Sequence, residues 1–159
     1  MTPEIQTPRI ATVAGAQEVA GLLDQFNREF DTPSPEPAVL TARLQRLLSG
    51  LDVVALLAGD PAVAVALLTL RPNVWCQGPV ALLDELYVAP AQRGRGIGAA
   101  LLKAAEAVVR ERGSELLEIN VDGEDTDARR FYERYGYTDR DPEQTQPQLY
   151  YHRNLVPPD

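Results

Sequence analysis

The hydrophobic and polar positions along the chain switch between helical and strand-like spacing, a pattern that predicts a mixed α/β fold. In some segments apolar side chains recur every three or four residues, as on one face of a helix. These segments predict helices over residues 16–30, 39–48, 98–112 and 125–135. Other segments are apolar runs or alternate between apolar and polar residues. They predict strands over residues 10–13, 52–58, 62–70, 80–88 and 116–122.

The order of these elements constrains the sheet. Gly59-Asp60-Pro61 joins the first two long strands and indicates a hairpin, and a third strand follows without a helix between, as in an antiparallel meander. A helix precedes strand 116–122, so this strand and the meander's last strand should be parallel. A closing hairpin is expected from Tyr137 onward, with residues 148–155 as its last strand. We expect residues 1–159 to form one domain with a mixed, mostly antiparallel sheet and a central parallel pair.

The composition describes an acidic globular chain. The net charge of -8 and the pI of about 4.7 leave no basic surface for nucleic acid and favour a positively charged partner. One cysteine, Cys76, excludes an intramolecular disulfide. No apolar run approaches the ~18 residues of a membrane span, and the acidic N-terminus does not resemble a signal peptide. We therefore expect a cytoplasmic protein without a membrane or nucleic-acid partner.

The connection between strand 80–88 and the next helix carries the strongest chemical signal. It contains three glycines and two arginines, namely Gly94, Gly96, Gly98, Arg93 and Arg95. The first turn of a helix leaves backbone amides unpaired at the positive end of the helix dipole. Glycines let an anion approach these amides because no Cβ stands in the way. The segment therefore predicts a phosphate-binding turn.

A dinucleotide-binding unit is one reading of this turn. Gly94, Gly96 and Ala99 match the Gly-x-Gly-x-x-Gly/Ala fingerprint, and Glu118 follows at about the ~20 residues expected for a ribose-binding acid. However, residues 89–93 separate the strand from the first glycine, and Pro90 among them cannot continue a strand. The remaining chain is also too short for a doubly wound sheet, so we reject this reading.

Two segments of the chain carry a further pattern. From Leu86 to Leu102 the chain reads Leu-Tyr-Val-x-Pro-x-x-Arg-Gly-x-Gly-Ile-Gly-x-x-Leu-Leu, and from Ala128 to Tyr137 it reads Ala-Arg-Arg-Phe-Tyr-Glu-Arg-Tyr-Gly-Tyr. The first segment resembles motif A, and the second resembles the second signature, of the GNAT superfamily of N-acetyltransferases. The order of the predicted elements also resembles the GNAT fold over nearly the full chain. The resemblance implies an N-acetyltransferase whose two parallel strands splay apart.

The resemblance implies that acetyl-coenzyme A is the acetyl donor. Backbone amides of the glycine turn would hold its pyrophosphate, and the two parallel strands would meet its pantetheine arm. The implied cofactor residues are Leu86, Tyr87, Val88, Arg93, Gly94, Arg95, Gly96, Ile97, Gly98, Ala99, Asn120 and Phe131. Asp125 stands where the family often has Asn. Because an acid there would repel phosphate, we expect Asp125 to cap the helix that follows.

The resemblance also implies a reaction in which the amine attacks directly, without a protein nucleophile or a metal. Tyr132 would then be the acid that protonates the leaving sulfur. Glu85 and Asp84 are candidates for the base, directly or through water. Strict strand alternation places these two carboxylates on opposite faces, so that only one would face the acceptor. We favour Glu85.

The acceptor is expected to be a primary amine on a cationic small molecule, similar to an aminoglycoside or a polyamine, or on a peptide. Residues 113–128 contain acids but no Lys or Arg, and this run includes Asp122. Residues 26–37 correspond to the segment that, in this family, forms a variable wall of the acceptor site. The candidate acceptor-binding residues are Phe26, Glu29, Phe30, Asp84 and Asp122. The alternative is a non-catalytic regulatory module that binds coenzyme A, and a homodimer is expected by family analogy alone.

Overall fold

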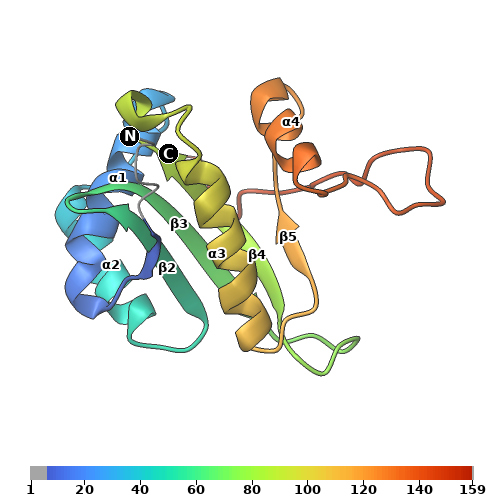
Figure 1. Cartoon of the computed structure of the whole chain (residues 1–159), viewed down its shortest axis with the longest axis horizontal. Helices are drawn as coiled ribbons and strands as arrows, with labels where there is room; N and C mark the ends of the chain where they lie inside the picture. Colours follow the sequence, from blue (N-terminus) through green and yellow to red (C-terminus); the bar gives the residue numbers. More distant parts are fainter. Residues whose placement is uncertain (1–6, 159) are drawn as a thin grey trace. The chain divides into compact units, whose positions relative to one another are not determined.

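The computed structural model describes residues 7–158 (Figure 1). The chain divides into two compact units, of which the first ends at Ile119 and the second begins at Asn120. In the described residues, the first unit holds a sheet and three α-helices, and the second holds one helix followed by an irregular segment. No helix of residues 7–158 is long and apolar enough to cross a membrane.

Five strands form one mixed sheet in the first unit. In order across the sheet they are β1 (Arg9–Ile10), β2 (Val53–Gly59), β3 (Ala62–Arg71), β4 (Val80–Val88) and β5 (Leu117–Ile119). Neighbouring strands are antiparallel except β4 and β5, which are parallel. The expected meander and the expected parallel pair are therefore both confirmed.

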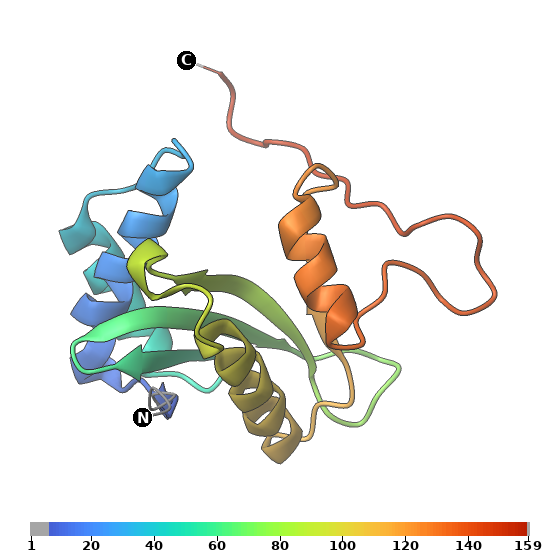
Figure 2. The ribbon, with the colours of Figure 1, turned by 45° about the horizontal axis from the view of Figure 1, so that its top comes forward.

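Helices cover both faces of this sheet. The helices α1 (Ala16–Glu29) and α2 (Pro37–Leu48) lie on one face, and α3 (Ile97–Glu111) lies on the other (Figures 1 and 2). The core under α1 and α2 includes Val19, Leu22, Leu44, Leu57 and Val65. The intervening strand residues Leu56 and Leu68 are fully buried on the α3 side, as are Leu101 and Leu102 of α3. Burial on both faces explains why the central strands read as continuous apolar runs.

Several element boundaries differ from those expected. The first strand has two residues, and the chain then makes a 3₁₀ turn, η1 (Val13–Gly15), before α1 begins. Helix α2 begins two residues earlier than the apolar spacing indicated, because Pro37 occupies its first position, where a missing amide costs nothing. Strand β5 has three residues in place of the expected seven over 116–122.

The closing hairpin expected from Tyr137 onward is wrong, because the structure has no strand in residues 120–158. A single hairpin-like bond remains, from the Gln148 amide to the Asp139 carbonyl oxygen at 2.7 Å. The Arg140 side chain donates to the Thr145 carbonyl oxygen and closes an irregular loop instead. Pro147 has no amide to donate to a strand ladder. The apolar positions of this segment, Leu149, Tyr150, Tyr151, Leu155 and Val156, are exposed.

The second unit contains one helix, α4 (Thr126–Arg134). Asp125 precedes it, and its carboxylate accepts a hydrogen bond from the Ala128 amide at 3.0 Å. This confirms Asp125 as the expected N-cap. No residue in the described range 120–158 is buried. A unit without its own core does not make an independent domain, so one domain over residues 1–159 stays our prediction.

The C-terminal end of α3 touches the loop between β3 and β4. Gly113 ends the helix at a φ of +86°, and a Cβ on Gly78 would lie 2.0 Å from the Gly113 carbonyl oxygen. The Ser114 hydroxyl donates to the Pro79 carbonyl oxygen at 2.7 Å beside this contact. The loop therefore approaches the helix end closely only because Gly78 has no side chain.

We expect Gly78→Ala to lower the free energy of unfolding by about 1–3 kcal/mol, the usual cost of forcing atoms into a packed contact. Urea denaturation followed by circular dichroism measures this change. Gly21→Ala is the matched control, because a Cβ at this position of α1 meets nothing within 4 Å. That control should stabilise the chain by about 0.5–1 kcal/mol. Equal stability of the Gly78 variant and the wild type would contradict the close approach of Gly78 to the Gly113 carbonyl oxygen.

Candidate active site

The glycine turn between β4 and α3 has the backbone geometry that an anion site requires. After Val88 the chain makes a short 3₁₀ turn, η2 (Pro90–Gln92), and then reaches Gly94 and Gly96, whose φ angles are +76° and +81°. Gly96 is the N-cap of α3, and its carbonyl oxygen accepts the first amide bond of the helix, from Ala100. The amides of the first turn, residues 97–99, therefore have no partner within the helix.

The side of the turn facing solvent is open to a ligand. A Cβ on Gly94 would meet nothing within 4 Å. Arg95 is exposed, and within the described residues its side chain forms one hydrogen bond, to the Gln92 side-chain oxygen at 3.3 Å. Unpaired amides, a helix dipole and a nearby guanidinium all favour an anion here. The structure thus brings residues 93–99 together as the predicted phosphate turn.

The edge of β4 that leads to this turn is also open. Strand β5 pairs with β4 only from Ala81 to Leu83. Within residues 7–158, no strand pairs with the remaining half of that edge, which includes Leu86, Tyr87 and Val88. An extended ligand can bind such an edge as an additional strand does, through backbone hydrogen bonds.

A bulge at Asp84 separates the paired and the open halves of β4. Leu68 of β3 lies opposite Leu83, and Leu67 lies opposite Glu85, so Asp84 has no partner across the sheet. Because of this extra residue, Asp84 and Glu85 both lie on the α1–α2 face of the sheet. The expectation that alternation places them on opposite faces is therefore wrong. The Thr69 hydroxyl, which lies on that same face, donates to the Asp84 carboxylate at 2.8 Å.

The two carboxylates of the bulge have perturbed acidities. Desolvation raises the pKa of the half-buried Glu85, and the negative charge of Asp84 raises it further. Desolvation also raises the pKa of Asp84, against the opposing effect of the Thr69 hydrogen bond. A carboxylate with a raised pKa is a better proton acceptor, so Glu85 has the property that a general base needs.

The C-terminal end of α1 lies against the end of β4. Phe26 contacts Phe30 and also Tyr87, with ring centroids 5.4 Å and 5.0 Å apart respectively. Glu29 accepts a hydrogen bond from the Tyr87 hydroxyl at 3.1 Å and pairs with Arg93 at 2.8 Å. The three α1 residues expected to bind the acceptor therefore lie together, but the Glu29 carboxylate faces Arg93 of the glycine turn.

Four further candidates belong to the second unit. Asn120 and Asp122 follow β5, and Phe131 and Tyr132 lie on α4. The Tyr132 ring contacts the rings of Phe131 and Tyr137, with centroids 5.2 Å and 5.9 Å apart. Their roles at the site stay predictions.

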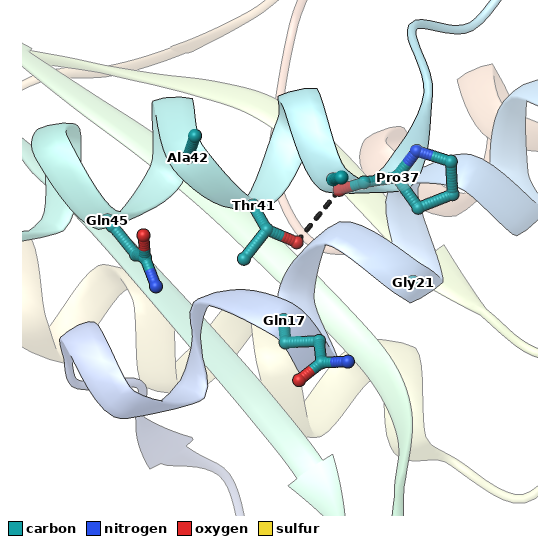
Figure 3. Close-up of a pocket in the computed structure, with 7 residues that line it drawn as sticks. Gln17, Gly21, Pro37, Thr41, Ala42 and Gln45 are labelled. Atoms are coloured by element: carbon teal, nitrogen blue, oxygen red, sulfur yellow. Dashed lines mark hydrogen bonds between the residues drawn. The ribbon is translucent and has the colours of Figure 1, made fainter.

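Within the described residues, the groove between α1 and α2 and the distribution of possible metal ligands give no second candidate site. The groove is lined by small, apolar and neutral polar residues, among them Gln17, Thr41 and Gln45 (Figure 3). It has no titratable side chain, and the Thr41 hydroxyl is bonded to the Pro37 carbonyl oxygen at 2.8 Å. Among residues 7–158, no three His, Cys, Asp or Glu side chains gather as metal ligands.

Sequence reasoning missed Thr69 and the bulge that it stabilises. The adjacent pairs Leu82-Leu83 and Asp84-Glu85 break the alternation of the strand and were the available signal. It also missed the pairing of Glu29 with Arg93, for which two residues 64 positions apart give no local signal.

The comparisons with known proteins agree on one family. Residues 19–137 match the acetyltransferase (GNAT) family model. A crystal structure of a candidate acetyltransferase from Arthrobacter sp. FB24 is 55% identical, with a TM-score of 0.91 over 98% of this chain and 99% of that one. An aminoglycoside acetyltransferase from an uncultured soil sample, in complex with sisomicin, superposes with a TM-score of 0.78 over 97% of this chain and 100% of that one. At 19% identity, this second likeness shows the fold alone.

Among curated proteins, the mycothiol acetyltransferase of Beutenbergia cavernae is 40% identical over 72 residues, which is 43% of this chain. The match covers 24% of that protein. The chain spans about a quarter to a third of the length of the first curated relatives that it matches. These local matches therefore do not carry a substrate over to this chain.

The raised pKa of Glu85 predicts a pH-dependent effect of Glu85→Gln on stability. A carboxyl whose folded-state pKa is raised contributes most to stability when protonated, and this contribution is lost as the pH rises through that pKa. We expect the variant to gain stability relative to the wild type between pH 4 and pH 7. Urea denaturation at several pH values measures the difference, with Glu115→Gln on the exposed loop after α3 as control. A difference that does not change with pH would contradict the desolvation of Glu85.

Proposed function

The chain belongs to the acetyltransferase (GNAT) family, and on this basis we propose that it moves an acetyl group from acetyl-coenzyme A to a primary amine. The observation that carries the proposal is the open edge of β4, which leads directly into the glycine turn. A pantetheine arm is extended and can pair with a strand edge, and a pyrophosphate suits the helix amides that follow. One continuous backbone surface thus fits both parts of coenzyme A.

Acetyl-coenzyme A is the acetyl donor of this family, and it supplies the acetyl group as an activated thioester. In this chain, the backbone of Leu86, Tyr87 and Val88 would hold the pantetheine arm. The amides of residues 93–99 would hold the pyrophosphate. The family resemblance also leads us to propose Asn120 and Phe131 as cofactor residues.

Glu85 is proposed as the general base. A primary amine is largely protonated at neutral pH and must lose a proton before its nitrogen can attack. Among the described residues, the Glu85 carboxylate forms no hydrogen bond or ion pair, whereas the Asp84 carboxylate accepts a hydrogen bond from Thr69. Because desolvation and Asp84 raise the pKa of Glu85, its carboxylate can take up the amine proton, directly or through water.

Tyr132 is proposed as the acid for the leaving sulfur. Its position matches the tyrosine of the second family signature, and a phenol hydroxyl can donate a hydrogen bond. A backbone amide at or near Val88 is proposed to polarise the acetyl carbonyl as negative charge develops on its oxygen. No side chain is required as a nucleophile in this scheme.

The acceptor is proposed to carry positive charge. Asp84 and Glu85 present two carboxylates on the α1–α2 face, and the acidic segment that contains Asp122 follows β5. Phe26 and Phe30 supply aromatic surface at the end of α1. A neighbour of the same fold was crystallised with sisomicin, which is consistent with an amine-bearing small molecule. We propose an aminoglycoside-like or polyamine-like acceptor, with a peptide amine as the other candidate.

The function is tested by following the release of coenzyme A thiol from acetyl-coenzyme A across a panel of aminoglycosides, polyamines, amino acids and peptides. We expect turnover with at least one cationic amine. Melting curves with acetyl-coenzyme A, coenzyme A and NAD should show stabilisation by the first two ligands alone. Stabilisation by NAD and none by acetyl-coenzyme A would refute the proposal. Stabilisation by coenzyme A without thiol release for any amine would favour a regulatory module instead.

Glu85→Gln should lower kcat by about 100-fold or more, within the range that general bases contribute. In the wild type, kcat/KM should fall as the pH drops through the pKa of Glu85, because a protonated carboxyl cannot accept a proton. Asp84→Asn is the matched comparison. It should move that fall to lower pH, because the Asp84 charge raises the pKa of Glu85. An unchanged pH profile in the Gln variant would remove Glu85 from the role of base.

A further inference from the structure

Arg93, at the start of the glycine turn, is bound on several sides by protein groups. Its Nη2 donates to both carboxylate oxygens of Glu29, each at 2.8 Å. Its Nε donates to the Val88 carbonyl oxygen at 2.9 Å, and the guanidinium lies 5.7 Å from the centroid of the Tyr87 ring. The charge of Arg93 is therefore balanced within the protein before any ligand binds.

Glu29 is held as firmly as the arginine that it binds. Its Oε1 also accepts the Tyr87 hydroxyl at 3.1 Å. Tyr87 is 3% exposed, and burial followed by the hydrogen bond to Glu29 raises the pKa of its hydroxyl, which therefore remains a donor. The Glu29 side chain is 25% exposed and the Arg93 side chain is 44% exposed. The pair is partly open to solvent, and the hydrogen bonds to an ionised partner are what hold both side chains in place.

The contact joins two functional segments that are distant in sequence. Glu29 is the last residue of α1, beside Phe26 and Phe30, and Arg93 begins the glycine turn. Arg95, two residues further on, pairs with no carboxylate in the described part of the chain. The two arginines of the turn, which look equivalent in the sequence, are thus in different electrostatic situations.

We propose that Glu29 is a positioning residue that holds the cofactor turn in place through Arg93, while Arg95 is the arginine whose charge serves the bound phosphates. This inference rests on the proposed function. The Arg93 side chain ties the turn to Val88 and to α1, so that the backbone amides after it are presented in a fixed arrangement. Glu29 thereby acts on the cofactor through Arg93, and it does not bind the acceptor amine.

The first arm of the test uses the ligand-free full chain. Glu29→Gln and Arg93→Gln should both speed hydrogen–deuterium exchange in a peptide covering residues 89–98, where Gln92 and Arg93 donate amide bonds to Ala89 and Pro90. Asp31→Asn is the matched control, because it removes the same charge two residues from Glu29 and suits the local φ of +51°. Equal exchange rates in the Glu29 variant and the wild type would overturn the proposal that Glu29 holds the turn in place.

The second arm measures the dissociation constant of coenzyme A by calorimetry. Glu29→Gln and Arg93→Gln should each weaken binding about three- to tenfold, and the double variant should be no weaker than Arg93→Gln alone, because that variant has already lost the contact with Glu29. Arg93→Lys should recover little of this loss, since a lysine lacks the planar fork with which Arg93 reaches Val88 and Glu29 from separate nitrogens. Tighter binding in the Glu29 variant, additive losses, or rescue by lysine would overturn the proposal and make Arg93 itself the phosphate ligand.

Arg95→Gln separates the two arginines. It should reduce the salt dependence of coenzyme A binding and add to the loss caused by Glu29→Gln, whereas Arg93→Gln should leave the salt dependence unchanged. The reverse pattern would overturn the assignment. If the wild type binds no coenzyme A, the proposed function fails, and the exchange measurement still decides whether Glu29 holds the turn.

Discussion

The site depends on one irregularity in the backbone, the extra residue Asp84 in the middle of β4. Before it, β4 pairs on both sides, with β3 and with β5; after it, pairing continues only with β3. The same bulge turns two consecutive carboxylates to one face, where desolvation and then the negative charge of Asp84 raise the pKa of Glu85. Thus a change of one residue in the register produces both the open strand edge and the candidate base.

The remaining parts of the site follow from how the chain leaves that strand. Beyond Val88 the backbone needs two left-handed residues before it can begin α3, and only glycine adopts them without strain. The helix on the other side of the sheet, α1, ends where β4 ends and contributes Glu29 to the arginine of the turn. The glycine turn and the end of α1 therefore meet at the end of β4, and the carboxylate pair lies in the middle of the same strand.

Much of this arrangement is predictable from the sequence, because local spacing determines it. The meander, the parallel pair and the glycine turn follow from apolar periodicity and from the positions of Gly and Pro. Three features do not follow from such local signals: the face of the sheet on which Asp84 lies, the length of β5, and the irregular conformation of residues 137–158. They depend on which backbone groups find partners across the sheet, as do the Glu29–Arg93 contacts between residues distant in sequence. Apolar alternation alone predicted a closing hairpin that the pairing does not form.

The glycine turn and the open edge of β4 offer a ligand backbone amides and carbonyls rather than particular side chains. An alanine scan would therefore pass over most of this surface, because exchanging a side chain leaves the amides and carbonyls in place. Substitutions would be poorly tolerated mainly at Gly94 and Gly96, because a residue with a Cβ is strained at their positive φ angles. Such a site allows its flanking side chains to diverge widely.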